Sequence, residues 1–192
     1  IKGILTSNIG IVNKYKNELF IVGDYKLNIF NKEALEFYSE DLDILPISEE
    51  LNRKEMKASL KGFKGNVSKT IYGKTELMVS EYCPIGSTFG EKDSNKECNR
   101  ACERDTFTLV DRMNEKFNVM TDIFCRSHLL NSLPTNLIEE IDDLKDMGIK
   151  CLRIDFTDES KEEVREIINE LNGKSLVDNK NYTKGHYRRG VE

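Results

Sequence analysis

The chain has 192 residues, the length of a single domain at roughly 150 residues per domain. Charged residues make up 33% of the chain, only 3 residues are Pro, and no apolar run reaches the roughly 18 residues that a membrane span needs. These features exclude disordered, collagen-like and membrane-spanning proteins, and the net charge of −5 argues against phosphate binding over the whole surface. We therefore expect a soluble domain of the cytoplasm without a membrane partner.

Strand and helix signals alternate over residues 1–82. Runs of β-branched and aromatic residues predict strands, and a short apolar segment lies between them. These stretches are 4–12, 20–30, 42–47 and 67–79. We expect Asn31 to cap one helix, and Ser48 to cap a second that runs to Gly62. This part of the chain is therefore predicted to consist of βα units.

Residues 83–125 interrupt that alternation. The stretch 83–106 shows neither helical nor strand periodicity and is rich in Gly, Ser and Cys, so it predicts an inserted loop. The runs 107–112 and 117–120, joined by a four-residue connection at 113–116, predict a β-hairpin. We therefore expect a Cys-rich loop followed by a hairpin.

The βα pattern returns in residues 126–173. Apolar residues spaced three or four apart predict a helix over 136–147, with Gly148 at its C-terminal cap. A strand is predicted at 149–156, and a second helix begins at Ser160. A helix–strand–helix sequence with short connections is typical of a parallel sheet or barrel.

Residues 174–192 form a basic tail, with five basic residues and one acidic residue between positions 174 and 190. An aromatic ring among basic groups is a candidate surface for the phosphates or bases of RNA. The residues concerned are His186, Tyr187, Arg188 and Arg189. The alternatives are a solvated end, a segment that closes a barrel, or a joint to another domain. Because the sequence begins at Ile1 without an initiator Met or signal peptide, we expect a fragment of a longer polypeptide whose remainder is its partner.

Four of the five cysteines fall within 43 positions around the irregular loop. These loop cysteines are Cys83, Cys98, Cys102 and Cys125. An odd number of cysteines in a cytoplasmic protein argues against a disulfide framework, so metal binding is the sharper hypothesis. Four thiolates suit either a [4Fe–4S] cluster or zinc, and the spacing does not separate the two. The alternative is that they are small buried residues without a ligand role, which is our interpretation of Cys151.

Several short stretches of the sequence resemble the peptidase U32 family, also called collagenase-like proteases. The matching stretches are 72–73, 77–78, 81–86, Cys98-x₃-Cys102, 109–112, 121–126, 131–132, 153–157 and 183–187. The resemblance implies the C-terminal half of a partial TIM-like (β/α) barrel with a Cys-bearing loop and a hairpin insertion. In better-studied relatives the family cysteines hold a [4Fe–4S] cluster, and those proteins assist hydroxylation of RNA or of a quinone precursor.

The resemblance also implies that Cys83, Cys98 and Cys125 are three of the cluster ligands. The remaining family ligand lies seven residues after the first, and Gly90 occupies that position here. Two possibilities follow from this departure. Either Cys102 serves as the fourth ligand, or the site is a degenerate copy that takes zinc or nothing.

Four charged residues near predicted strand ends are weak catalytic candidates, because barrel enzymes place their working groups there. They are Asp122, Arg126, Arg153 and Asp155. A paired network that only stabilises the barrel is the alternative. With His128 and His186 as the only histidines, neither a Ser/His/Asp nor a Cys/His set for acyl transfer can be assigned.

Three functions are compatible with these observations. The first is an iron–sulfur domain of an enzyme that modifies RNA or a cofactor-like molecule, in a fragment that lacks a complete active site. The second is a structural zinc module in a binding or scaffolding protein. The third is a U32-type peptidase.

Overall fold

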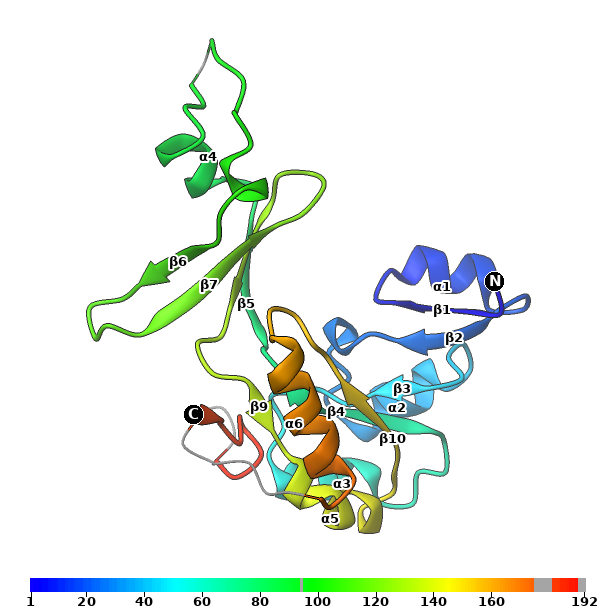
Figure 1. Ribbon diagram of the computed structural model, residues 1–192. Helices are drawn as coiled ribbons and strands as arrows, with labels where there is room; N and C mark the ends of the chain where they lie inside the picture. Colours follow the sequence, from blue (N-terminus) through cyan, green and yellow to red (C-terminus); the bar gives the residue numbers. More distant parts are fainter. Residues whose placement is uncertain (94, 175–180, 190–192) are drawn as a thin grey trace. The chain divides into compact units, whose positions relative to one another are not determined.

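The computed structural model describes residues 1–93, 95–174 and 181–189 and shows a mixed α/β chain (Figure 1). The chain divides into two compact units. We call Ile1–Gly73 together with Thr135–Glu192 the α/β unit, and Lys74–Pro134 the cysteine unit, because the latter contains all four loop cysteines.

Parallel strands form the framework of the α/β unit. They are β1 (Gly3–Thr6), β2 (Phe20–Gly23), β3 (Leu45–Pro46), β4 (Val67–Gly73) and β10 (Ile149–Ile154). Strand β1 pairs with β2, and β4 lies between β3 and β10. A parallel bridge between Val22 and Ile44 joins these two groups, while β9 (Thr135–Asn136) pairs with β4 in the antiparallel direction. The described strands form open sheets and no closed barrel.

Helices of the α/β unit follow its strands in a βα repeat. They are α1 (Ile9–Tyr15), α2 (Lys32–Tyr38), α3 (Arg53–Leu60), α5 (Ile141–Asp146) and α6 (Lys161–Leu171), with 3₁₀ turns at Tyr25–Leu27 and Ile138–Glu140. The predicted caps at Asn31 and Ser160 are confirmed: Asn31 accepts a hydrogen bond from the Ala34 amide, and Ser160 forms a capping box with Glu163. In the described part of the chain, no helix combines the length and apolarity that a membrane crossing requires.

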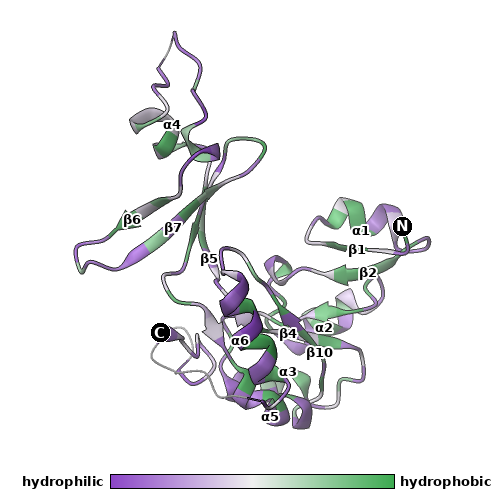
Figure 2. Ribbon diagram, in the orientation of Figure 1, coloured by the Kyte–Doolittle hydropathy of each residue, from purple (hydrophilic) through white to green (hydrophobic). Residues whose placement is uncertain are grey.

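The hydrophobic core of the α/β unit lies between its strands and helices. It includes Ile21, Leu35, Met56, Ile71 and Leu144, all of which are almost fully buried. Helix α6 is amphipathic: Ile167 is buried in the same core, and polar residues cover the opposite side of the helix (Figure 2). Burial of this apolar surface is the main force that stabilises the unit.

Two predicted elements in the first half of the α/β unit were wrong. The stretch 4–12 is a strand only as far as Thr6, because the Asn8 side chain caps α1 by accepting a hydrogen bond from a backbone amide. The helix assigned to a Ser48 cap begins at Arg53 instead, since Asn52 forms the capping box there. The Ser48 hydroxyl is buried and donates to the side chain of Asn28.

The predicted strands at 20–30 and 67–79 are also shorter or divided. The first ends at Gly23, and Asp24 then caps a 3₁₀ turn. The second is divided between β4 and β5, which belong to different units. The division falls at Gly73, whose φ of +143° suits glycine and which leaves no room for a Cβ beside the backbone of Asp155.

An antiparallel sheet forms most of the cysteine unit. Its strands are β5 (Glu76–Ser80), β6 (Phe107–Val110), β7 (Lys116–Thr121) and β8 (Ser127–Leu130), in the spatial order β5-β8-β7-β6. The predicted hairpin is present as β6 and β7. The short helix α4 (Pro84–Thr88) and a 3₁₀ turn (Ala101–Glu103) lie in the long connection between β5 and β6.

Candidate functional site

The four loop cysteines line one pocket of about 660 Å³ in the cysteine unit. We call it the cysteine pocket. Cys83 caps α4, Cys98 precedes the 3₁₀ turn, Cys102 lies in it, and Cys125 lies in the turn between β7 and β8. None of the five cysteines, all of which are in described segments, forms a disulfide. Thiols from three separate elements are thus available at one pocket.

Backbone amides face two of these sulfur atoms. The Gly86 amide donates to Sγ of Cys83 at 3.2 Å, and the Arg100 amide donates to Sγ of Cys98 at 3.3 Å. A Cβ placed on Gly86 would lie 3.4 Å from the Cys83 sulfur and 3.6 Å from the Cys98 sulfur, so both sulfurs border the same small space. Amide donors of this kind stabilise a thiolate and tune a metal bound to it.

Gly90 occupies the position at which the family resemblance implies a further ligand. A Cβ built on Gly90 would lie 2.5 Å from the Cys98 sulfur and 2.7 Å from the carbonyl oxygen of Gly86. A cysteine therefore does not fit at position 90 unless the loop moves. The sulfur of Cys98 already fills the space in which that side chain would begin.

The residues present fit a metal centre in their chemistry, because four thiols are the usual ligand set for zinc or a [4Fe–4S] cluster. Their arrangement is more open than a finished metal site. Over the described residues, no three His, Cys, Asp or Glu side chains are gathered closely enough to hold a metal ion. The cysteine pocket thus contains a suitable set of donors that must move closer together to share one metal.

Asp122 and Arg126, two of the predicted catalytic candidates, form an ion pair next to this pocket. The Arg126 side chain donates to Asp122 Oδ2 at 2.7 Å, and Nε2 of His128 lies 3.4 Å from the same oxygen. Although burial opposes it, these contacts and backbone hydrogen bonds hold the pKa of Asp122 well below its ordinary value. Nδ1 of His128 lies 2.6 Å from Glu76, which places the imidazole between two carboxylates.

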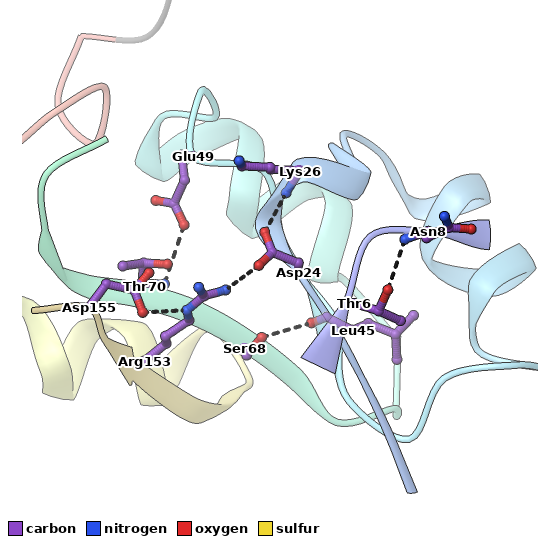
Figure 3. Close-up of polar contacts among 10 residues, drawn as sticks. All are labelled: Thr6, Asn8, Asp24, Lys26, Leu45, Glu49, Ser68, Thr70, Arg153 and Asp155. Atoms are coloured by element: carbon purple, nitrogen blue, oxygen red, sulfur yellow. Dashed lines mark hydrogen bonds and ion pairs between the residues drawn. The ribbon is translucent and has the colours of Figure 1, made fainter. Parts of the chain in front are cut away.

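Arg153 and Asp155, the other two candidates, belong to the α/β unit. Figure 3 shows the Arg153 guanidinium between two carboxylates, at 2.7 Å from Asp155 and 3.3 Å from Asp24. The guanidinium also lies over the ring of Tyr25, 5.4 Å from its centroid. The four candidates therefore form two separate pairs in different units, and the contacts described do not join them in one network.

Sequence reasoning missed two acidic residues that follow parallel strands of the α/β unit. Asp24 directly follows β2, and Glu49 follows β3 and accepts a hydrogen bond from the buried Lys69 at 2.6 Å. The Thr70 amide also donates to Glu49 (Figure 3). A signal was available for Glu49, which follows the predicted apolar segment 42–47, since the carboxyl ends of parallel strands lie at one edge of a sheet. Asp24 gave no such signal, because it lay inside the predicted strand 20–30.

The basic tail does not present Tyr187 to a nucleic acid. Its side chain is only 3% exposed and belongs to the hydrophobic core, and its hydroxyl donates to Asp143. The ring is therefore not free to stack on a base. Arg188, which is exposed, pairs with Glu140 at 3.1 Å, and His186 and Arg189 are also exposed. The part of the tail between 175 and 180 lies outside the described residues.

A comparison with protein-family models supplies the context for this geometry. The model for peptidase family U32 matches residues 2–180 of the chain. Searches of curated proteins and of solved structures found no match. Because the family model covers nearly the whole sequence, the chain belongs to peptidase family U32.

Proposed function

We propose that the cysteine unit binds a metal centre through Cys83, Cys98, Cys102 and Cys125, with a [4Fe–4S] cluster as the preferred occupant. The proposed role is in an enzyme that modifies RNA or a cofactor-like molecule by hydroxylation in the cytoplasm. One observation carries the proposal: four thiols spread over 43 positions of the sequence line the same pocket. Packing of small apolar residues does not account for this, because none of the four is fully buried.

Cys102 is the proposed fourth ligand in place of Gly90. The space at Gly90 is filled by the sulfur of Cys98, whereas Cys102 already lines the pocket. The connection between Cys98 and Cys102 includes Arg100, whose φ of +56° is a left-handed conformation. The chain therefore turns sharply between the two cysteines, so that both can approach the pocket.

A bound cluster would supply single-electron transfer, and the residues of the chain would set its surroundings. The amides of Gly86 and Arg100 would donate to the ligand sulfurs, and Asp122 would provide a negative charge at the rim of the pocket. Zinc is the alternative occupant, because the thiols suit it equally and a structural zinc would order the loop without redox chemistry.

The α/β unit is proposed to be part of a TIM-like barrel. Support comes from the parallel strands β1, β2, β3, β4 and β10, whose spatial order follows the chain. Asp24, Glu49 and Asp155 follow three of these strands at their carboxyl ends, where barrel enzymes bind substrates. This edge would be the substrate-facing side of the unit.

Peptidase activity is the second candidate, and the family match favours it. His128 gives it little support, since both of its ring nitrogens face carboxylates. Cleavage of a peptide substrate by the wild type, and its loss in Cys98→Ala, would support a metal-assisted peptidase. Unchanged cleavage in that variant would contradict a metal-dependent mechanism.

The test of the main proposal is the metal content of the protein prepared without air. We expect iron and sulfide in equal amounts with a visible absorption band, and loss of both in Cys83→Ala and Cys125→Ala. The matched control is Cys151→Ala, because Cys151 lies in β10 outside the pocket. One zinc per chain without sulfide would support the structural alternative, and a metal-free wild type would contradict both.

A further inference from the structure

Two turns of the cysteine unit have the same backbone design. The first turn, Asp111–Glu115, joins β6 to β7, and the second turn, Asp122–Arg126, joins β7 to β8 (Figure 1). In each turn the leading Asp accepts side-chain hydrogen bonds from the amides two and four residues later. Its carbonyl accepts a third from the amide three residues later. The two turns are therefore an internal comparison in which only the side chains differ.

The residue at the fourth position is left-handed in both turns. Asn114 has φ of +64° in the first turn, and Cys125 has φ of +59° in the second. Asn is one of the few residues other than Gly that adopt this conformation readily, whereas Cys has no such preference. A strained residue of this kind persists where its surroundings over-determine it, and such residues cluster at functional sites.

The second turn carries additional support. Asp122 is paired with the Arg126 side chain at 2.6 Å and faces His128, whose other ring nitrogen lies 2.6 Å from Glu76. Asp122 and Cys125 both line the cysteine pocket. The second turn is thus held by contacts to Glu76 in β5 and His128 in β8, while its residues Asp122 and Cys125 line the cysteine pocket.

We propose that Asp122, supported by Arg126, His128 and Glu76, is a positioning residue that holds Cys125 in its left-handed conformation and so presents the thiol to the cysteine pocket. This inference rests on the proposed function, because it assigns the pocket to a metal. Asp122 itself is not a ligand in this proposal. It acts through the backbone of the turn.

The test titrates the metal-free full chain with Co²⁺, whose thiolate complexes absorb in the visible and near-ultraviolet range. We expect Asp122→Ala, which removes the acceptor of the turn amides together with the partner of Arg126, to weaken Co²⁺ binding by about 10- to 100-fold, as is typical when the residue that orients a metal ligand is lost. At saturation its spectrum should resemble that of Cys125→Asn, because Cys125 no longer contributes a thiolate. The matched control Asp111→Ala removes the equivalent acceptor from the first turn and should bind Co²⁺ as the wild type does.

A second pair of variants protects the test against misfolding. Glu76→Gln and His128→Gln keep the volume of the network and should each weaken Co²⁺ binding in the same direction as Asp122→Ala. Equal affinity in Asp122→Ala and Asp111→Ala, with an intact wild-type spectrum, would overturn the positioning role alone. A wild-type chain that shows no cobalt–thiolate band would overturn the proposed metal site and this inference together.

Discussion

The two compact units of the chain differ in what holds them together. Every residue of the hydrophobic core cluster belongs to the α/β unit. The buried apolar residues described in the cysteine unit are Ile85, Ala101 and Leu130. Small units with so little buried apolar surface commonly depend on a metal or on disulfides, and the loop cysteines are all free. The comparison therefore shows that apolar packing is concentrated in one unit, and our proposal is that metal binding completes the other.

The largest effect that we expect is the loss of the metal by Cys98→Ala. Because metal–thiolate binding energy becomes folding energy in a loop with little core, residues 83–125 should become at least about tenfold more sensitive to protease. Mapping of the cleavage sites by mass spectrometry measures this. Cuts that appear equally in the α/β unit, or an unchanged digestion pattern with the metal retained, would contradict the comparison.

A core substitution should destabilise the α/β unit and leave the metal content of the cysteine unit unchanged. Leu144 in α5 is fully buried, so Leu144→Ala should lower the free energy of unfolding of the α/β unit by about 2–5 kcal/mol. Chemical denaturation followed by circular dichroism measures the loss. The metal content per folded chain should stay at the wild-type value, and a decrease in it would show that the units do not depend on separate interactions.

A smaller effect is expected at the carboxyl edge of the parallel strands. Arg153→Met removes the partner of two partly buried carboxylates, Asp24 and Asp155, and should destabilise the α/β unit by about 1–2 kcal/mol. Asp142→Asn is the control, because Asp142 is almost fully exposed and pairs with Lys145 only at 3.6 Å. A loss of less than 0.5 kcal/mol, roughly the range of neutral surface substitutions, would argue against a structural role for the Arg153 network.

The smallest effect concerns acid stability in the α/β unit. The hydrogen bond from Arg53 lowers the pKa of Asp143, against a smaller opposing effect of burial. Because the folded pKa lies below the unfolded one, this stabilisation is complete above the ordinary carboxyl pKa of about 3.9 and is lost as pH falls through the folded value. Thermal unfolding at pH 7 and pH 3 should therefore show a smaller acid-induced decrease in Tm for Asp143→Asn than for the wild type. An equal decrease would exclude this linkage.

Local features of the fold were predictable because they depend on neighbours in the sequence. The caps at Asn31 and Ser160 and the hairpin at 107–120 were all recognisable from short patterns. The errors arose where two local readings were equally compatible with the residues. Ile9, Ile11 and Val12 are β-branched and apolar, but the Asn8 cap directs this segment into a helix.

The candidate site was only partly predictable. Sequence spacing indicated that the loop cysteines act together, and they do line one pocket. It did not indicate that Asp122 and Arg153 belong to different units, because a list of charged residues near strand ends contains no information on partners. The contact between Asp24 and Arg153 joins residues 129 positions apart, which no local pattern encodes.

The sequence by itself determined the family, the alternation of strands and helices in the first and last parts of the chain, and the cysteine-rich segment between them. It could do so because composition, periodicity and short motifs are properties of adjacent residues. Only the tertiary structure decided that Tyr187 is buried against Asp143, that Cys98 occupies the space beside Gly90, and that Cys125 sits in a left-handed turn. These features depend on close packing between distant segments, where a difference of one side chain decides which groups meet.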